Sequence, residues 1–253
     1  MILVGCNKNT VKGPYLYDDS SYKFGNISIE EEVEEINVDW LVGNIIISKQ
    51  DNNELIIREE KDSALNDDYK FRYLITKNSV DIKFTKSFEE IDYQFRIKNL
   101  YLYLPSTVKK ITINSHNAVV KCDSITVDTL IIEGEESSIN IDKSSIKSLK
   151  IKTESEDIIL FNNVLDDLEI ETKNSNIGIL VNEELTNLSI KTVQGNTSLY
   201  VSNSFNCNVT FDSKGQFTSK LDCKQEINNY IFNQGKNNYF ILSDEGDLRI
   251  YLK

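Results

Sequence analysis

The sequence repeats a short apolar-x-apolar pattern at a nearly constant interval. From residue 111 onward, the first residues of successive copies are 19, 19, 19, 20 and 21 positions apart. The copies are Ile111–Ile113, Leu130–Ile132, Leu149–Ile151, Leu168–Ile170, Leu188–Ile190 and Val209–Phe211. Successive residues of a strand face opposite sides, so each copy directs two apolar side chains into a core. A unit this short cannot bury its apolar face alone, so we expect the copies to stack.

A second short strand follows most copies by about nine residues. These strands are Ile139–Ile141, Ile158–Leu160, Ile177–Ile179 and Leu199–Val201. The intervening turns are rich in Gly, Asn, Ser and Thr, which accept positive φ or bond locally to the backbone. The fold class that we predict is all-β, a single-domain β-solenoid. It is a β-helix-like stack of short strands with a repeat of about 19–21 residues.

The same register predicts two further columns, each made of the equivalent positions of successive repeats. A third apolar position precedes the copies by three or four residues and is expected to fill a corner; it is occupied by Val127, Ile146, Leu165, Leu185 and Phe205. Another corner should carry a stacked column of mostly hydroxyl side chains: Ser115, Gly134, Thr153, Thr172, Thr192 and Ser213. We interpret both columns as structural.

A leucine-rich repeat is the competing interpretation. Leu165-x-x-Leu168-x-Ile170 reproduces the opening of that repeat, and the next copy does the same. The leucine-rich fold needs Asn or Cys three positions after the third apolar residue, where this chain has Lys173 and Val193. The second strand of each unit also favours the solenoid of paired strands.

The first hundred residues keep a looser form of the same periodicity. Strand candidates are Ile27–Ile29, Ile36–Trp40, Asn44–Ser48, Glu54–Glu59, Tyr69–Leu74, Val80–Phe84, Tyr93–Ile97 and Leu100–Leu104. The charged segments 60–68 and 86–92 are expected to be loops on the side of the solenoid or the tips of hairpins. No linker divides the chain, so we expect residues 26–253 to form one domain, irregular to about residue 105 and regular from about 106 to 215. Tyr239–Leu242 and Leu248–Leu252 are expected to cap the C-terminal end of the stack.

The N-terminus contains a possible lipidation site. Leu3-Val4-Gly5-Cys6 resembles a bacterial lipobox, in which the cysteine is lipidated, and residues 1–25 would then form a tether. Only five residues precede Cys6, fewer than the charged start and apolar region that an export signal needs. Two interpretations therefore stay open: a lipoprotein whose start lies upstream of this sequence, or an ordinary apolar N-terminus. Elsewhere no stretch approaches the roughly 20 apolar residues of a membrane span.

Composition narrows the classes of partner and cofactor. The formal net charge is −12, and lysines are interleaved with acids, which disfavours nucleic acid and direct binding to anionic lipid. The four cysteines lack CxxC spacing and His116 is the only histidine, which disfavours a zinc site. We therefore expect no metal, no cofactor and no catalytic residues.

The outward positions of the first strands carry alternating charges. In register these are Glu133, Lys152, Glu171, Lys191 and Asp212. Opposite charges on adjacent strands stabilise the register. A glycosidase would instead need two acids about 5 to 10 Å apart in different environments.

The outward positions of the second strands change from polar to apolar along the stack. Asn140 and Asp142 are followed by Ile159 and Phe161, then by Gly178 and Leu180, then by Tyr200. A contiguous exposed apolar patch usually marks a partner surface. We therefore predict that Ile159, Phe161, Leu180 and Tyr200 form a contact with a second copy of the chain or with a ligand. Cover by a loop is the alternative.

Several stretches together resemble a known family. Ile36–Trp40 with Gly43–Ile47, then Lys98–Pro105, then the Leu-x-Ile-x-Thr repeats are similar to the bacterial putative-adhesin family of β-solenoid cell-envelope proteins. The resemblance runs from about residue 26 to near the end of the chain. It implies a β-solenoid of mostly undefined biochemical activity, with no catalytic set to transfer.

These observations favour a non-catalytic binding or structural module of the cell envelope. Its partner would be a protein or glycan at the cell surface, with membrane attachment only through an N-terminal anchor. Two alternatives belong to other classes: a carbohydrate-active enzyme on a β-helix scaffold, and a regulatory domain of the envelope-stress response.

Overall fold

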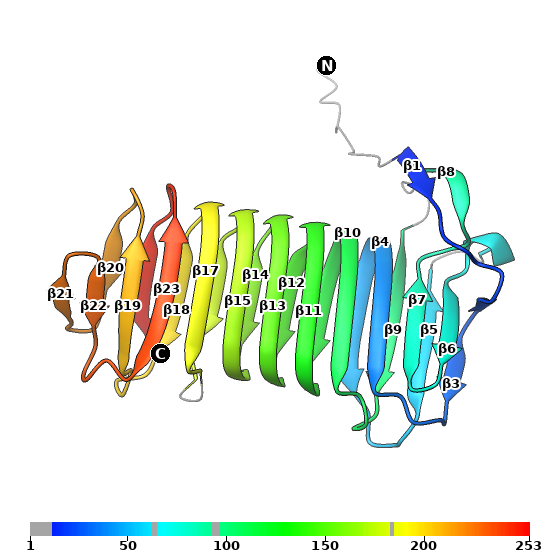
Figure 1. Ribbon diagram of the computed structural model, residues 1–253, viewed down its shortest axis with the longest axis horizontal. Helices are drawn as coiled ribbons and strands as arrows, with labels where there is room; N and C mark the ends of the chain where they lie inside the picture. The colour runs from blue at the N-terminus through cyan, green and yellow to red at the C-terminus, as the bar shows by residue number, and fades with distance from the viewer. Residues whose placement is uncertain (1–11, 62–64, 93–96, 183–184) are drawn as a thin grey trace, which may run out of the picture.

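The computed structural model describes residues 12–61, 65–92, 97–182 and 185–253, and it shows a long rod of stacked strands (Figure 1). In the regular part, each repeat makes one strand in a first sheet and one in a second sheet, with the core between them. The first-sheet strands are β11 (Thr126–Glu136), β13 (Ser145–Ser155), β15 (Val164–Asn174) and β17 (Asn187–Gln194). The second-sheet strands are β12 (Ser138–Asp142), β14 (Ile158–Phe161), β16 (Ile177–Leu180) and β18 (Thr197–Val201). We call each such pair of strands a rung.

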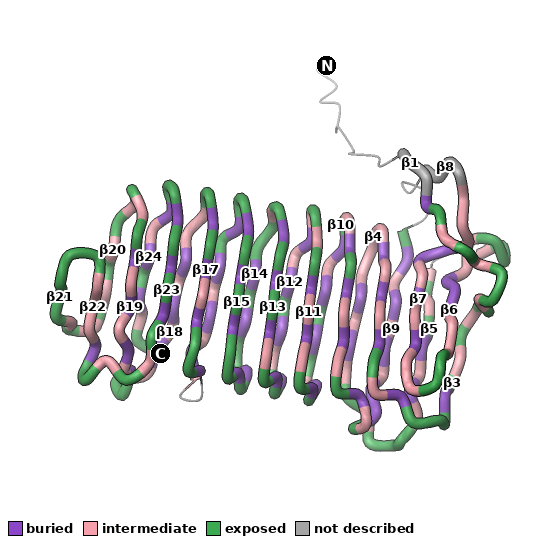
Figure 2. The backbone as a smooth tube through the Cα atoms, viewed as in Figure 1, coloured by how far each residue is buried: buried purple, intermediate pink, exposed green. Residues whose placement is uncertain are grey.

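Adjacent rungs pair in parallel and in the predicted register. Ile111 pairs with Leu130, Leu130 with Leu149, Leu149 with Leu168, and Leu168 with Leu188. The predicted solenoid is therefore confirmed. Side chains alternate between buried and exposed along the strands, which Figure 2 shows as alternating purple and green or pink segments. All five residues of the predicted third apolar column, Val127, Ile146, Leu165, Leu185 and Phe205, are buried.

Two long strands bend from one sheet into the other. They are β4 (Glu35–Lys49) and β10 (Lys110–Asp123). The first half of β10 pairs with β11 and its second half with β12, while β4 pairs with β10 along its whole length. The expected strands Ile36–Trp40 and Asn44–Ser48 are thus two halves of β4. Gly43, at φ +109°, lies between these halves.

The C-terminal strands do not cap the rod, contrary to the expectation. β23 (Asn237–Ser243) pairs with β17 on one side and with β19 (Cys207–Asp212) on the other. β24 (Leu248–Leu252) likewise lies between β18 and β20 (Phe217–Ser219). The chain therefore skips one rung after β18, builds the next, and returns to fill the gap. Sequence spacing measures chain length and cannot show which strand becomes the neighbour, so the expected contact of Val209–Phe211 with Leu188–Ile190 was wrong.

A short hairpin closes the C-terminal end of the rod instead. It consists of β21 (Lys224–Glu226) and β22 (Asn229–Ile231), and β22 pairs antiparallel with β19 (Figure 1). Its tip carries Ile227, which is 89% exposed and has φ +54°. An antiparallel hairpin covers the edge of the last first-sheet rung, which would otherwise be open to pairing.

Antiparallel strands also close the other end. Here β7 (Ser79–Lys83) and β9 (Lys98–Leu104) pair in parallel with the two halves of β4. On the outside, β6 (Arg72–Thr76) pairs antiparallel with β7, and β2 (Lys23–Phe24) pairs antiparallel with β6. In the same way β5 (Leu55–Glu60) pairs with β9, and β3 (Ile27–Ile29) pairs with β5. A 3-10 turn spans Asp67–Tyr69. Apart from β4, which stacks on β10, the described part of the first hundred residues thus forms an end cap. Residues 93–96 of the expected strand Tyr93–Ile97 and residues 62–64 of the expected loop 60–68 lie outside the described residues.

The described part of the expected tether packs on this cap. β1 (Lys12–Tyr15) pairs antiparallel with β8 (Phe88–Asp92), so most of the expected loop 86–92 is a strand. The Tyr15 side chain is buried and its hydroxyl donates to the Asp39 carbonyl oxygen at 3.3 Å. The Tyr17 hydroxyl donates to the Thr85 carbonyl oxygen at 2.6 Å. Folded chain therefore begins well before the expected boundary at residue 26.

A buried ion pair holds the N-terminal cap together. Lys98 pairs with Glu59, and their side chains are 1% and 6% exposed. Lys98 Nζ also donates to the carbonyl oxygens of Tyr69, at 2.7 Å, and Phe84. Burial lowers the pKa of Lys98 to about 8 although Glu59 opposes the shift, and burial raises the pKa of Glu59. One ammonium group thus joins β5, β9 and two loops.

In the described ranges no helix is long and apolar enough to cross a membrane.

Candidate binding faces

The predicted apolar residues lie together on the outer face of the second sheet. Ile159 and Phe161 are on β14, Leu180 is on β16 and Tyr200 is on β18, each with its side chain outward. Ile159 and Phe161 are 37% and 36% exposed, while Leu180 and Tyr200 are half-buried. Within the described chain no loop is seen to bury them, so the four residues form one accessible patch.

Aromatic rings continue this patch along the rod. The rings of Phe161 and Tyr200 meet edge to face, with centroids 5.6 Å apart and an interplanar angle of 84°. Tyr200 stacks on Tyr251, with centroids 5.3 Å apart and an angle of 22°. A Cβ on Gly178 would lie 3.9 Å from Phe161 Cε1, so this glycine leaves a shallow step beside the ring. We call Phe161, Leu180, Tyr200 and Tyr251 the aromatic row.

Tyr251 was missed by sequence reasoning because β24 fills the rung next to β18. Tyr251 pairs with Tyr200, and Arg249 with Ser198. The pattern Leu248-x-Ile250 is itself apolar-x-apolar, which was the available signal for another rung. Its position beside Tyr200, however, depends on the return of the chain from the C-terminal hairpin.

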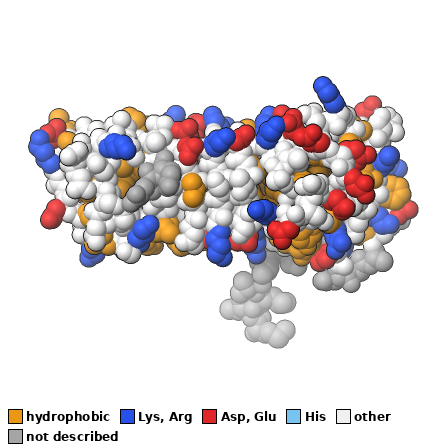
Figure 3. Space-filling model, turned by 90° about the horizontal axis from the view of Figure 1, so that it is seen from below, with side chains coloured by type: hydrophobic (Ala, Val, Ile, Leu, Met, Phe, Trp, Pro, Cys, Tyr) orange, Lys and Arg blue, Asp and Glu red, His pale blue; other side chains and the backbone are white. Residues whose placement is uncertain are grey.

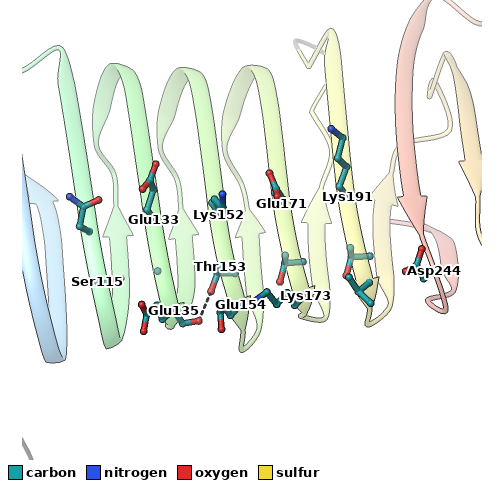
Figure 4. Close-up of a pocket in the computed structure, with 15 residues that line it drawn as sticks. Ser115, Glu133, Glu135, Lys152, Thr153, Glu154, Glu171, Lys173, Lys191 and Asp244 are labelled. Atoms are coloured by element: carbon teal, nitrogen blue, oxygen red, sulfur yellow. Dashed lines mark hydrogen bonds and ion pairs between the residues drawn. The ribbon is translucent and has the colours of Figure 1, made fainter. Parts of the chain in front are cut away.

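The outer face of the first sheet forms a second candidate site, a shallow groove of about 600 Å³. Side chains from successive strands line it in rows (Figure 4). One row has the order Asn114, Glu133, Lys152, Glu171, Lys191, Leu242, Asp212, as the strand pairing shows. We call Glu133, Lys152, Glu171 and Lys191 the charge row. The predicted alternation is thus present, but Leu242 separates Lys191 from Asp212.

The floor of the groove is the predicted corner column. Ser115, Gly134, Thr153, Thr172 and Thr192 occupy adjacent rungs as expected. Ser243 of the inserted strand β23 then follows Thr192, and Ser213 comes one rung later than expected. The hydroxyls bond to nearby turns; Thr192 Oγ1, for example, donates to the Gln194 carbonyl oxygen at 2.7 Å. This column therefore stabilises the corner, which supports its structural interpretation.

The two glutamates of the charge row differ from the acid and base of a glycosidase in one respect. Glu133 and Glu171 are two rungs apart, roughly 10 Å along the stack, and Lys152 lies between them. Both carboxylates are exposed and share the same neighbour, whereas the acid and base of a glycosidase need different environments. Among the described residues no group of three His, Cys, Asp or Glu could hold a metal ion. Figure 3, which views the rod from below, shows acidic and basic side chains interspersed along its length.

Cys6, the predicted lipidation site, lies outside the described residues. The three other cysteines are free; Cys122 and Cys207 are buried and Cys223 is half-buried. Burial raises the pKa of the Cys122 thiol to about 12 and that of Cys207 to about 11. These two thiols act as small apolar groups of the core.

The fold and these faces define a class: a capped β-solenoid that displays side chains on two outer sheet faces. The chain belongs to the Toastrack DUF4097 family, whose model matches residues 18–251. The family is consistent with the resemblance found in the sequence.

The chain is also similar to solved structures of three bacterial proteins. A putative cell adhesion protein from Clostridium sporogenes is 14% identical, with a TM-score of 0.38, and the match covers 91% of this chain and all of the other. A putative adhesin from Bacteroides fragilis is 12% identical, with a TM-score of 0.39 and coverage of 91% and 97%. A putative adhesin from Parabacteroides merdae is 10% identical, with a TM-score of 0.41 and coverage of 92% and 97%. No curated protein matches the chain.

Proposed function

We propose that this protein is a non-catalytic binding module of the bacterial cell surface and that its aromatic row contacts an extended glycan. The observation that carries the proposal is the aromatic row itself: three rings and a leucine on adjacent rungs of the outer face of the second sheet. Aromatic side chains offer large apolar surfaces at low conformational cost, and they can pack on the C–H faces of sugar rings.

The surroundings of the row favour a glycan over a protein partner. From Phe161 to Tyr251 the row crosses three rung steps, roughly 14 Å. A stable protein interface buries about 800 Å² on each partner, which a strip this short does not supply. Beside the rings, Asn140, Ser198 and Arg249 offer hydrogen-bonding groups on the same face. A narrow row of apolar contacts with polar groups beside it suits a chain of a few sugar units.

The envelope location belongs to the same proposal. A lipid at Cys6 would attach the rod to a membrane through its N-terminal end, leaving both sheet faces free. Mass spectrometry of the native protein tests this anchor, because a lipidated Cys6 adds a diacylglyceryl group. A native protein that keeps an unmodified Met1 and is found in a cytosolic fraction would contradict the proposed anchor.

Titration calorimetry with peptidoglycan fragments, chitin oligosaccharides and neutral glucans tests the binding face. We expect at least one of these probes to bind, and Phe161→Asp and Tyr251→Ser each to weaken that binding tenfold or more. Val164→Asp is the matched control, since Val164 is 44% exposed but lies outside the aromatic row. Binding that is unchanged in Phe161→Asp would show that the site lies elsewhere. Binding to purified surface proteins but to no glycan would overturn the choice of ligand.

A further inference from the structure

The charge row on the first sheet consists of four charged side chains that form no ion pair with other described residues. Along the described chain, none of Glu133, Lys152, Glu171 and Lys191 forms an ion pair within 4.0 Å, and all four are exposed. The rows on either side differ: Lys150 pairs with Glu169 at 3.0 Å, and Glu154 pairs with Lys173. Figure 4 shows the side chains of the charge row in one line across adjacent strands. Four exposed charges of alternating sign are thus available to a partner.

The charges of the charge row, read in one direction along the rod, are opposite in sign to the same charges read in the other direction. Read along the rod the signs are −, +, −, +, and read backwards they are +, −, +, −. We propose that two copies of this protein pack first sheet against first sheet as antiparallel rods. The two-fold axis would pass between the Lys152 and Glu171 rungs and lie along the strand direction. Lys152 then faces Glu171 of the second copy, and Glu133 faces its Lys191, and each pair occurs twice.

The opposite orientation is disfavoured by the same residues. If the rods ran parallel in register, Glu133 would face Glu133 and Lys152 would face Lys152. Like charges across an interface suppress that arrangement. The neighbouring rows agree with the antiparallel dimer, because Lys150 would face Glu169 and Glu154 would face Lys173 of the second copy. The charges therefore select both the orientation and the register.

Exposed apolar side chains flank the charged centre on the same face. Phe240 is 51% exposed and Leu242 is 40% exposed, both on β23. β23 is the third rung from the proposed axis, and there it would meet β10 of the second copy, which presents Thr112 and Asn114, with Ile131 on the next strand. The dimer would thus cover Phe240 and Leu242 at both ends, by the two-fold symmetry.

The size of the face predicts a weak and salt-sensitive dimer. Six rungs by about six residues give a face of roughly 25 Å by 20 Å, or about 500 Å² per copy, below the roughly 800 Å² of a standard interface. Exposed ion pairs add little each and are screened by salt. A second copy suits the row better than a neutral polymer, which would leave all four charges unpaired. The two aromatic faces would point outward, so the dimer could bind two ligands, although it does not depend on them.

Sedimentation equilibrium at about 0.1 M and about 1 M salt tests the dimer, since the Debye length falls from about 10 Å to about 3 Å over this range. We expect concentration-dependent dimerisation at low salt and monomers at high salt. Lys152→Glu should weaken the dimer at least about tenfold, because each dimer contains the altered pair twice. Lys121→Glu makes the same change in net charge on the second sheet and should have no effect.

Exchanging the charges of residues 152 and 171 distinguishes contacts between two copies from contacts within one chain. Lys152→Glu combined with Glu171→Lys places like charges side by side within each chain, at Glu133 and residue 152, and at residue 171 and Lys191. It keeps every opposite-charge contact across the proposed two-fold axis. We expect the double variant to dimerise nearly as well as the wild type, with circular dichroism confirming that it is folded. A monomeric wild-type protein at millimolar concentration and low salt, or a folded double variant that stays monomeric, would overturn the proposal.

Discussion

Replacing Lys98 by Met would leave a carboxylate buried without its counterion. Glu59 would keep one hydrogen bond, from the Phe71 amide at 3.1 Å, while its side chain stays 6% exposed. The carbonyl oxygens of Tyr69 and Phe84 would also lose the Lys98 ammonium as a donor. Removing one partner of a buried ion pair costs about 3–5 kcal/mol. That is a large part of the roughly 5–15 kcal/mol by which a typical domain is stable.

Urea unfolding followed by circular dichroism measures this cost. In the double variant Lys98→Met with Glu59→Gln, the glutamine side-chain oxygen can still accept from the Phe71 amide without a charge. We therefore expect it to recover at least about 1.5 kcal/mol of the loss, because no buried charge remains unpaired. Lys109→Met is the control, since its exposed ion pair with Glu34 should matter little to the unfolding midpoint.

The effect should also depend on pH. Burial already raises the pKa of Glu59 in the native protein, and loss of Lys98 removes the charge that opposes this shift. A carboxyl group with a raised folded-state pKa stabilises the fold below its unfolded pKa, and this stability is lost as pH rises through the folded value. Lys98→Met should therefore cost less at pH 5 than at pH 7. A cost below about 1 kcal/mol at neutral pH, or purely additive effects in the double variant, would refute the proposed role of this pair.

Three further predictions follow from local geometry. Gly43→Ala should destabilise the protein by at least about 2 kcal/mol, as measured by urea unfolding. Gly43 has φ +109°, and an added Cβ would lie 2.0 Å from the Lys98 carbonyl oxygen. Ile227→Asn should stabilise the C-terminal hairpin by up to about 1 kcal/mol, since Asn tolerates the positive φ that Ile227 adopts; a lower melting temperature would contradict this. With a maleimide reagent at neutral pH, Cys223 should react faster than Cys122, whose thiol is buried with a raised pKa; equal rates in the native protein would contradict the burial.

The regular part of the fold could be read from the sequence because its contacts are nearly local. Each strand between Ile111 and Ile190 pairs with the equivalent strand one repeat, 19 or 20 residues, away. The apolar-x-apolar pattern therefore fixes which side chains are buried and which rung follows. The same register places Ile159, Phe161, Leu180 and Tyr200 on one outer face of the second sheet.

The ends of the rod could not be read in this way. At the C-terminus, β23 and β24 lie beside β17 and β18, about 50 positions earlier in the sequence, and at the N-terminus β4 joins β10 across 75 positions. A period in the sequence records the length of one winding, but it does not record where the chain leaves the stack or where it returns.

What the sequence determined by itself is therefore the solenoid, its inward and outward faces and the alternation of the charge row. Only the tertiary structure decided that Tyr251 extends the aromatic row, that Leu242 ends the charge row and that Lys98 is buried against Glu59. The physical reason is the same in each case. Alternation along a strand is a local property, whereas the identity of the neighbouring strand depends on which distant segments bury their apolar faces against each other.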